Sequence, residues 1–68
     1  MQKIQDVPPQ PLLLNMKQAS LVLNLGKSKI YDLMENEGLP YTKLGKSLRF
    51  PYHSLQEWIE QRMQGNVA

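Results

Sequence analysis

Apolar residues recur at helical spacing in three short stretches of this chain, and the middle stretch shows the pattern most clearly. Within residues 26–36, Ile30, Leu33 and Met34 lie at i, i+3 and i+4, so they share one side and need a core to pack against. The other side is polar and carries Ser28, Asp32 and Glu35, with Lys29 and Tyr31 on its flanks. This stretch therefore predicts an amphipathic helix that presents a polar face.

The stretch before it predicts another helix over residues 16–23. Asn15 is a favourable N-cap, and Gln18 stands where a capping box places Glu or Gln. The expected buried stripe consists of Met16, Ala19, Val22 and Leu23. A short apolar run at residues 12–14 precedes the cap, and we expect it to pack back onto the core.

Residues 24–26 break the pattern between these two helices. Two short helices joined by a short turn with glycine are typical of a helix-turn-helix, and Leu25 is expected to fill the angle between them. An ordinary helical hairpin in a small bundle is the other interpretation. The second helix begins with two lysines and a serine, and such a basic, hydroxyl-bearing start suits the helix end that enters the major groove of DNA.

The remaining helix is expected near the C-terminus. Gly38 suits a left-handed cap for the second helix, and Pro40 prevents its continuation. Pro51 can open the last helix. A capping box of Ser54 and Glu57 would instead start it three residues further on, and we predict the earlier start. Its apolar side would carry Tyr52, Leu55, Trp58, Ile59 and Met63, with Trp58 as the anchor of the core.

Residues 41–50 predict a short β-hairpin between the second and third helices. A two-residue loop that begins with glycine would pair Leu44 with Ser47. A three-residue loop would pair Leu44 with Leu48 instead, and we predict this register because a slip by one residue scatters the apolar side chains. It places Thr42, Leu44, Leu48 and Phe50 on one face, and the basic residues Lys43 and Arg49 on the other. A basic hairpin that rests beside a helix-turn-helix is a wing, so the predicted fold is mainly α, a winged helix-turn-helix of order α-α-β-β-α.

Length and composition indicate one small domain of 68 residues. We expect the domain over residues 12–63, a flexible lead-in with three prolines over residues 1–11, and a flexible tail over residues 64–68. The chain has no cysteine, which excludes disulfides and thiolate metal sites. It has neither a signal peptide nor an apolar run near the ~20 residues that span a bilayer, so we expect a cytoplasmic protein.

The charge is unevenly distributed, although the net charge is only +2. Between Lys17 and Arg49 there are six basic residues and three acidic ones, whereas Glu57 and Glu60 make the C-terminal helix acidic. This polarity suits a protein with one face toward an anion.

Gly-Lys-Ser occurs twice, at residues 26–28 and 45–47, and invites comparison with a nucleotide-binding loop. Such a loop needs another glycine five residues earlier, where this chain has Leu21 and Pro40. Two basic turns that donate to DNA phosphates fit the sequence better. His53 could be combined with Ser54 or Asp32, but no third orienting group is evident, so we expect no catalytic residue, metal, cofactor or small-molecule ligand.

The order of these elements resembles a known family, the small winged helix-turn-helix domains of excisionases and AlpA-like prophage regulators, which are related to the MerR-type domain. The resemblance covers about residues 12–63 and is carried by five segments: Met16–Ser20, Leu25–Leu33, Gly38–Pro40, Lys43–Phe50 and Leu55–Ile59. It implies that the second helix binds the DNA major groove and that the wing binds the neighbouring backbone or minor groove.

The resemblance also implies which residues contact DNA. On the second helix these are Lys27, Ser28, Lys29, Tyr31 and Asp32; on the wing Lys43, Lys46, Ser47 and Arg49; and, more weakly, Lys17 and Gln18 of the first helix. Two positions depart from the family pattern. Gly26 stands where a serine cap is common, and Asp32 where a basic residue is common, although an acid there can accept from cytosine N4.

The expected function is that of an excisionase, a sequence-specific protein that binds and bends double-stranded DNA near a recombination site so that an integrase favours excision. The integrase and further copies of the protein on adjacent sites are the expected partners. A small prophage or plasmid transcription regulator would have the same fold and is an alternative. A basic module that binds an acidic protein is a second alternative, of a different class.

Overall fold

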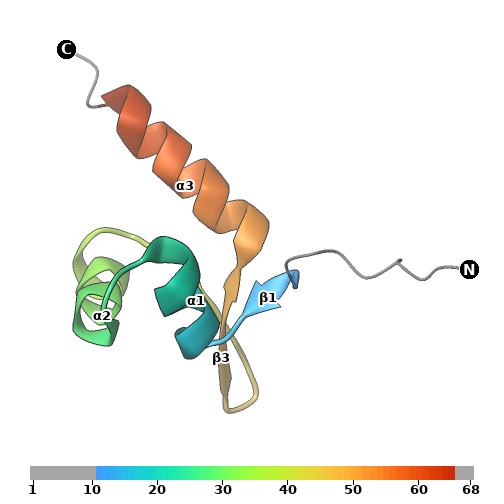
Figure 1. Ribbon diagram of the computed structural model, residues 1–68. Coiled ribbons are helices and arrows are strands. Elements are labelled where there is room, and N and C mark those ends of the chain that lie inside the picture. The colour runs from blue at the N-terminus through green and yellow to red at the C-terminus, as the bar shows by residue number, and fades with distance from the viewer. Residues whose placement is uncertain (1–10, 66–68) are drawn as a thin grey trace, which may run out of the picture.

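The computed structural model describes residues 11–65 as three helices and three short strands (Figure 1). The elements are β1 (Leu13–Leu14), α1 (Met16–Leu23), α2 (Lys27–Asn36), β2 (Thr42–Leu44), β3 (Ser47–Pro51) and α3 (Tyr52–Gly65). Most of the predicted lead-in, residues 1–10, lies outside the described part. The predicted tail begins inside α3, which extends to Gly65, and residues 66–68 are also outside.

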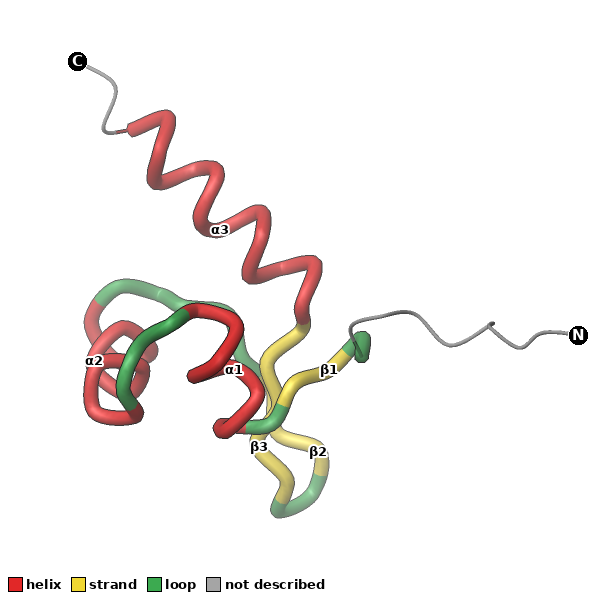
Figure 2. The backbone as a smooth tube through the Cα atoms, in the orientation of Figure 1, coloured by secondary structure: helices red, strands yellow, loops and turns green. Residues whose placement is uncertain are grey.

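The three helices and the hairpin confirm the predicted fold class, and the sheet has one strand more than predicted. β3 is the central strand, with β1 on one side and β2 on the other, both antiparallel to it (Figure 2). β1 pairs Leu13 with Pro51 and Leu14 with Phe50. The expectation that the run at residues 12–14 packs back onto the core holds only for Leu14, which is buried, whereas Leu12 and Leu13 are exposed.

The core lies where α1, α2, α3 and the sheet meet, and Phe50 of β3 is its largest fully buried side chain. The other buried residues are Leu14, Ala19, Ile30, Leu33, Leu39 and Leu55. Trp58 was expected to anchor this core, but it is only half-buried, and it packs against the buried cluster without belonging to it. Three further residues of the predicted stripes are exposed: Val22, Ile59 and Met63. A domain this small buries only a limited fraction of its surface, so parts of each stripe stay in solvent.

The predicted capping box at the start of α1 is present. The Asn15 Oδ1 atom accepts from the Gln18 backbone N–H at 2.8 Å, and the Gln18 Oε1 atom accepts from the Asn15 backbone N–H at 2.9 Å. α1 ends at Asn24, which adopts the left-handed conformation at φ 57° and ψ 45°. Beyond it, the Ser20 hydroxyl donates to the Leu25 carbonyl oxygen at 2.6 Å, which fixes the turn into α2.

α2 ends as the sequence predicts. Gly38 has φ +76°, a conformation that glycine adopts without the steric cost of a Cβ atom. The Leu33 carbonyl oxygen accepts from the backbone N–H groups of Glu37 at 2.9 Å and Leu39 at 3.1 Å. The chain thus reverses tightly, and Leu39 enters the core.

The predicted register of the hairpin is wrong. The pairs are Leu44 with Ser47, Lys43 with Leu48 and Thr42 with Arg49, so the loop has two residues. Its first residue, Gly45, has φ +65°, which a short hairpin loop of this kind requires. The turn geometry prevails over the apolar pattern, and as a result the Leu44 side chain is 56% exposed.

α3 follows β3 without an intervening loop. β3 ends at Pro51 and α3 starts at Tyr52, which confirms the earlier of the two predicted starts. The Tyr52 backbone N–H donates to the Leu12 carbonyl oxygen at 2.9 Å. The C-terminal end of α3 extends beyond the rest of the fold (Figure 1). In the range 11–65, no helix combines the length and the hydropathy that crossing a membrane requires.

Candidate nucleic-acid interface

The first turn of α2 is exposed and basic. Gly26 is the N-cap, and it makes no side-chain cap bond, unlike Asn15 at the start of α1. Lys27, Ser28 and Lys29 are all exposed. Backbone N–H groups in the first turn of a helix have no partner within the helix, and they suit an anion such as a phosphate oxygen. The missing serine cap therefore leaves this end of α2 open.

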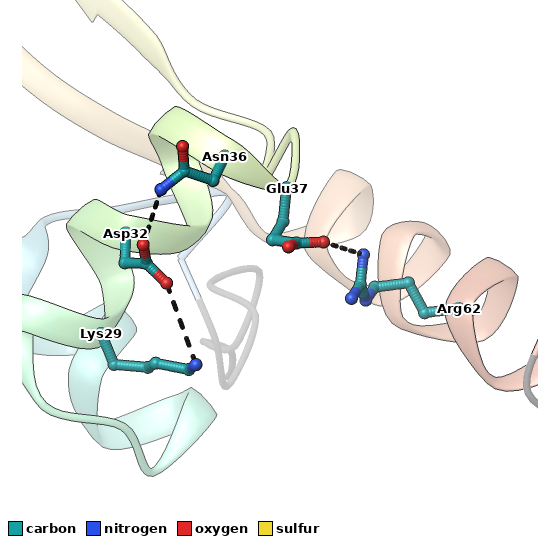
Figure 3. A network of polar contacts seen from close by, with 5 residues as sticks. All are labelled: Lys29, Asp32, Asn36, Glu37 and Arg62. Carbon is teal, nitrogen blue, oxygen red and sulfur yellow. Dashed lines mark hydrogen bonds and ion pairs between the residues drawn. The ribbon is translucent and has the colours of Figure 1, made fainter.

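Asp32 is held by two neighbours on the exposed side of α2 (Figure 3). Its Oδ2 atom lies 3.9 Å from the Lys29 Nζ atom, and its Oδ1 atom accepts from the Asn36 Nδ2 atom at 2.6 Å. Lys29 and Asp32 are 58% and 52% exposed, so the pair contributes little to stability. It does offset the negative charge of Asp32, which would otherwise repel DNA from this face.

An open groove separates α2 from the hairpin. Met34 and Leu48, both partly buried, belong to its lining and pack against the core. Tyr31 and Glu35 line it from α2, while Tyr41, Lys43 and Lys46 line it from the hairpin and the residue just before β2. The groove thus brings together Tyr31, Lys43 and Lys46, which the sequence analysis named on separate elements, and Tyr41, which it did not name.

The basic residues of the hairpin do not share one face, in contrast to the prediction. Lys43 is opposite Leu48, whereas Arg49 is opposite Thr42, and side chains of successive strand residues point to opposite faces. Arg49 is partly buried, and its Nη1 atom donates to the Leu48 carbonyl oxygen at 2.8 Å. Ser47 is also partly buried, next to the loop. Lys43 and Lys46 are therefore the exposed cations of the wing on the side of α2.

A second groove lies between α1 and the start of α2. It is lined by Met16, Lys17, Ser20, Leu21 and Lys27. The structure thus brings Lys17 and Lys27 to one groove. Gln18 is partly buried, and its side-chain oxygen is used in the capping box, so only its amide group remains as a donor.

The titratable residues that the structure describes do not form a recognisable catalytic arrangement. His53 contacts Glu57 on α3, with 3.1 Å between the Nε2 and Oε2 atoms, and both side chains are exposed. Within residues 11–65, no three residues of the types His, Cys, Asp and Glu lie close enough to hold a metal ion. What the geometry brings together is a set of cations, hydroxyls and open N–H groups, which suits an anionic polymer.

Comparison with known proteins gives one match. A family model described as a helix-turn-helix domain matches residues 13–63, which is 51 of the 68 residues. No curated protein and no solved structure matches at a significant level. The matched region begins in β1 and runs through the two helices and the hairpin into the last turns of α3. The chain therefore belongs to the helix-turn-helix domain family and is a DNA-binding protein of that fold.

Proposed function

We propose that this protein is an excisionase, a factor that binds specific duplex DNA near a recombination site and bends it so that an integrase favours excision. α2 would enter the major groove with its N-terminal turn first, and the wing would contact the neighbouring backbone or minor groove. The observation that supports this mode of DNA binding is the common groove between α2 and the hairpin, which Tyr31 of α2 lines together with Lys43 and Lys46 of the hairpin.

The roles of the individual residues follow from their positions. Ser28, Lys29 and Tyr31 are on the exposed side of α2 and would reach base edges, together with Asp32. Lys27 at the helix start and Lys17 on α1 line one groove and would contact phosphates. Lys43 and Lys46 would hold the wing on the backbone, and Ser47 and Arg49 would support them. Gln18 would contribute least, because its oxygen is engaged in the capping box.

The excisionase assignment is supported by the resemblance in element order and by the segments that carry it, from Met16–Ser20 to Leu55–Ile59. Further copies on adjacent DNA sites and an integrase are the proposed partners. Exposed apolar side chains on α3, Ile59 and Met63, offer contact area for such partners. α3 contacts α2 at Glu37, the end opposite the turn that would enter DNA, so protein partners on α3 and DNA on α2 would use different parts of the domain.

The test is a recombination assay on a plasmid that carries the two attachment sites of the element that encodes this protein, with its purified integrase. Excision that requires the protein supports the proposal. A variant with Ser28→Ala and Lys29→Ala, which leaves every buried residue in place, is the matched control and should lose excision. Unchanged excision without the protein, together with specific binding at a promoter, would show a transcription regulator instead.

A further inference from the structure

The groove between α2 and the hairpin has features that neither element has alone. Its free volume is ≈ 480 Å³. Tyr31 and Tyr41 lie ten positions apart in the chain, yet both residues line it, and they are 46% and 48% exposed. Lys43 and Lys46 also line it. Two tyrosines and two lysines therefore line one groove together with Met34 and Leu48, which are partly buried and pack against the core.

The donors in this groove suit a phosphate more than a base. Lysine can only donate hydrogen bonds, and a phosphodiester oxygen can only accept them. A base edge that is read specifically presents a pattern of donors and acceptors, which the planar arginine fork or the amide of Asn or Gln matches best, and among the described residues none of these types lines the groove. Small-molecule sites usually enclose most of the ligand, whereas this groove is open along its length.

The position of the groove leads to the same ligand. If α2 lies in the major groove and the wing reaches the next minor groove, the DNA strand that separates these two grooves must pass between α2 and the hairpin. We propose that the groove seats the sugar–phosphate backbone of this strand, and that the Tyr41 hydroxyl donates to one of its phosphates. This inference rests on the proposed mode of DNA binding. It adds Tyr41, in the segment before β2, to the DNA-contacting residues.

Glu35 sets the limit on how strongly the groove binds. It is exposed on α2, one turn after Tyr31, and it lines the groove. Among the described residues, no ion pair within 4.0 Å joins it to Lys43 or Lys46. Its carboxylate therefore repels a phosphate that enters the groove. In this proposal Glu35 weakens binding to the DNA backbone on every sequence. The base contacts of α2 then determine which DNA site the protein binds.

Two substitutions test the groove, with Kd measured by fluorescence anisotropy on a specific and a random duplex. Tyr41→Phe removes one hydroxyl and should weaken binding to both duplexes by roughly tenfold or more, as expected for a hydrogen bond to a charged group. Glu35→Gln should strengthen binding to both by roughly threefold or more, and less so at high salt. Glu60→Gln on α3 makes the same charge change outside the groove and is the matched control.

A scan with single methylphosphonates, which are uncharged, then locates the contact. At one phosphate between the two DNA grooves, the neutral linkage should weaken DNA binding by the wild type. The wild type and Tyr41→Phe should then bind this duplex with equal affinity. The proposal is overturned if Tyr41→Phe binds like the wild type, or if Glu35→Gln and Glu60→Gln have equal effects, while the wild type still binds its specific site. A wild type that binds no duplex DNA would instead overturn the proposed function itself.

Discussion

The indole of Trp58 donates from its Nε1 atom to the backbone carbonyl oxygen of Glu37, 3.2 Å away and 21 positions earlier in the chain. Arg62, one turn further along α3, pairs its Nη1 atom with the Oε1 atom of the same Glu37 at 3.1 Å (Figure 3). Its guanidinium carbon lies 4.6 Å from the centre of the Trp58 ring. These contacts join the middle of α3 to the end of α2, and they lie partly in solvent, so each stabilises the fold only modestly.

We expect Phe50→Ala to destabilise the domain more than Trp58→Ala. Phe50 is fully buried in the central strand, and removing a buried aromatic ring costs about 3–5 kcal/mol, comparable with the whole stability of a small domain. Trp58 is half-buried, so Trp58→Ala should still fold, with a lower midpoint of urea unfolding than the wild type. Urea unfolding followed by circular dichroism measures both variants. Equal midpoints would contradict this order of burial.

The left-handed turn between α1 and α2 can be tested at Asn24. Asn24→Val should lower the free energy of unfolding by roughly 1–2 kcal/mol, because a Cβ-branched residue is strained at φ 57°. Asn24→Gly, the control, should have a small effect because glycine adopts this conformation freely. If both variants unfolded at the same urea concentration, the turn would not have this geometry.

Binding to duplex DNA should depend strongly on salt. If about five phosphates are contacted, log K should fall against log salt concentration with a slope of roughly −4 to −5. Titration of a labelled duplex over a range of salt concentrations gives this slope. A flat response would mean that the exposed cations, Lys27, Lys43 and Lys46 among them, do not meet DNA phosphates.

The wing and the helix should contribute differently to specificity. Lys46→Ala should weaken specific and random binding by similar factors and reduce the salt slope by about one, since a phosphate contact carries no base information. Ser28→Ala, Lys29→Ala or Tyr31→Ala should instead lower the ratio of specific to random affinity, because a good base contact contributes roughly 1–3 kcal/mol of discrimination.

Both affinities must be measured for each of these variants in one buffer. None of the four residues is buried, so all variants should melt like the wild type, and this melt is the control. Relaxed base preference in Lys46→Ala, with intact preference in the helix variants, would show that the wing reads the sequence and that α2 does not.

The helices were predictable because their ends carry local signals. The capping box of Asn15 and Gln18, and the left-handed Gly38, depend on residues within a few positions of one another. The register of the hairpin was not predictable in this way, because two local signals conflict. The glycine at position 45 favours a two-residue loop, and Leu44 is left exposed as the result. β1 was missed because two residues are too short to show a strand period.

The site was predictable only where it lies within one element. The exposed basic start of α2 could be read from residues 26–36. The groove could not be predicted, because the reversal at Gly38 and the packing of the hairpin are what bring Tyr31 and Tyr41 to the same groove. Trp58 was misjudged for a similar reason, since residue size and helical spacing do not tell how far a small core extends along α3.

The direct passage from β3 into α3 restricts where this chain can change in length. At the tip of the hairpin, an inserted residue would alter the loop and leave both ends of the sheet in place. Between Pro51 and Tyr52 it would turn the whole of α3 by about 100° about its axis. Leu55 would then leave the core, and Trp58 and Arg62 would face away from Glu37. Relatives of this protein should therefore vary in length at the wing tip and keep the strand-to-helix junction constant.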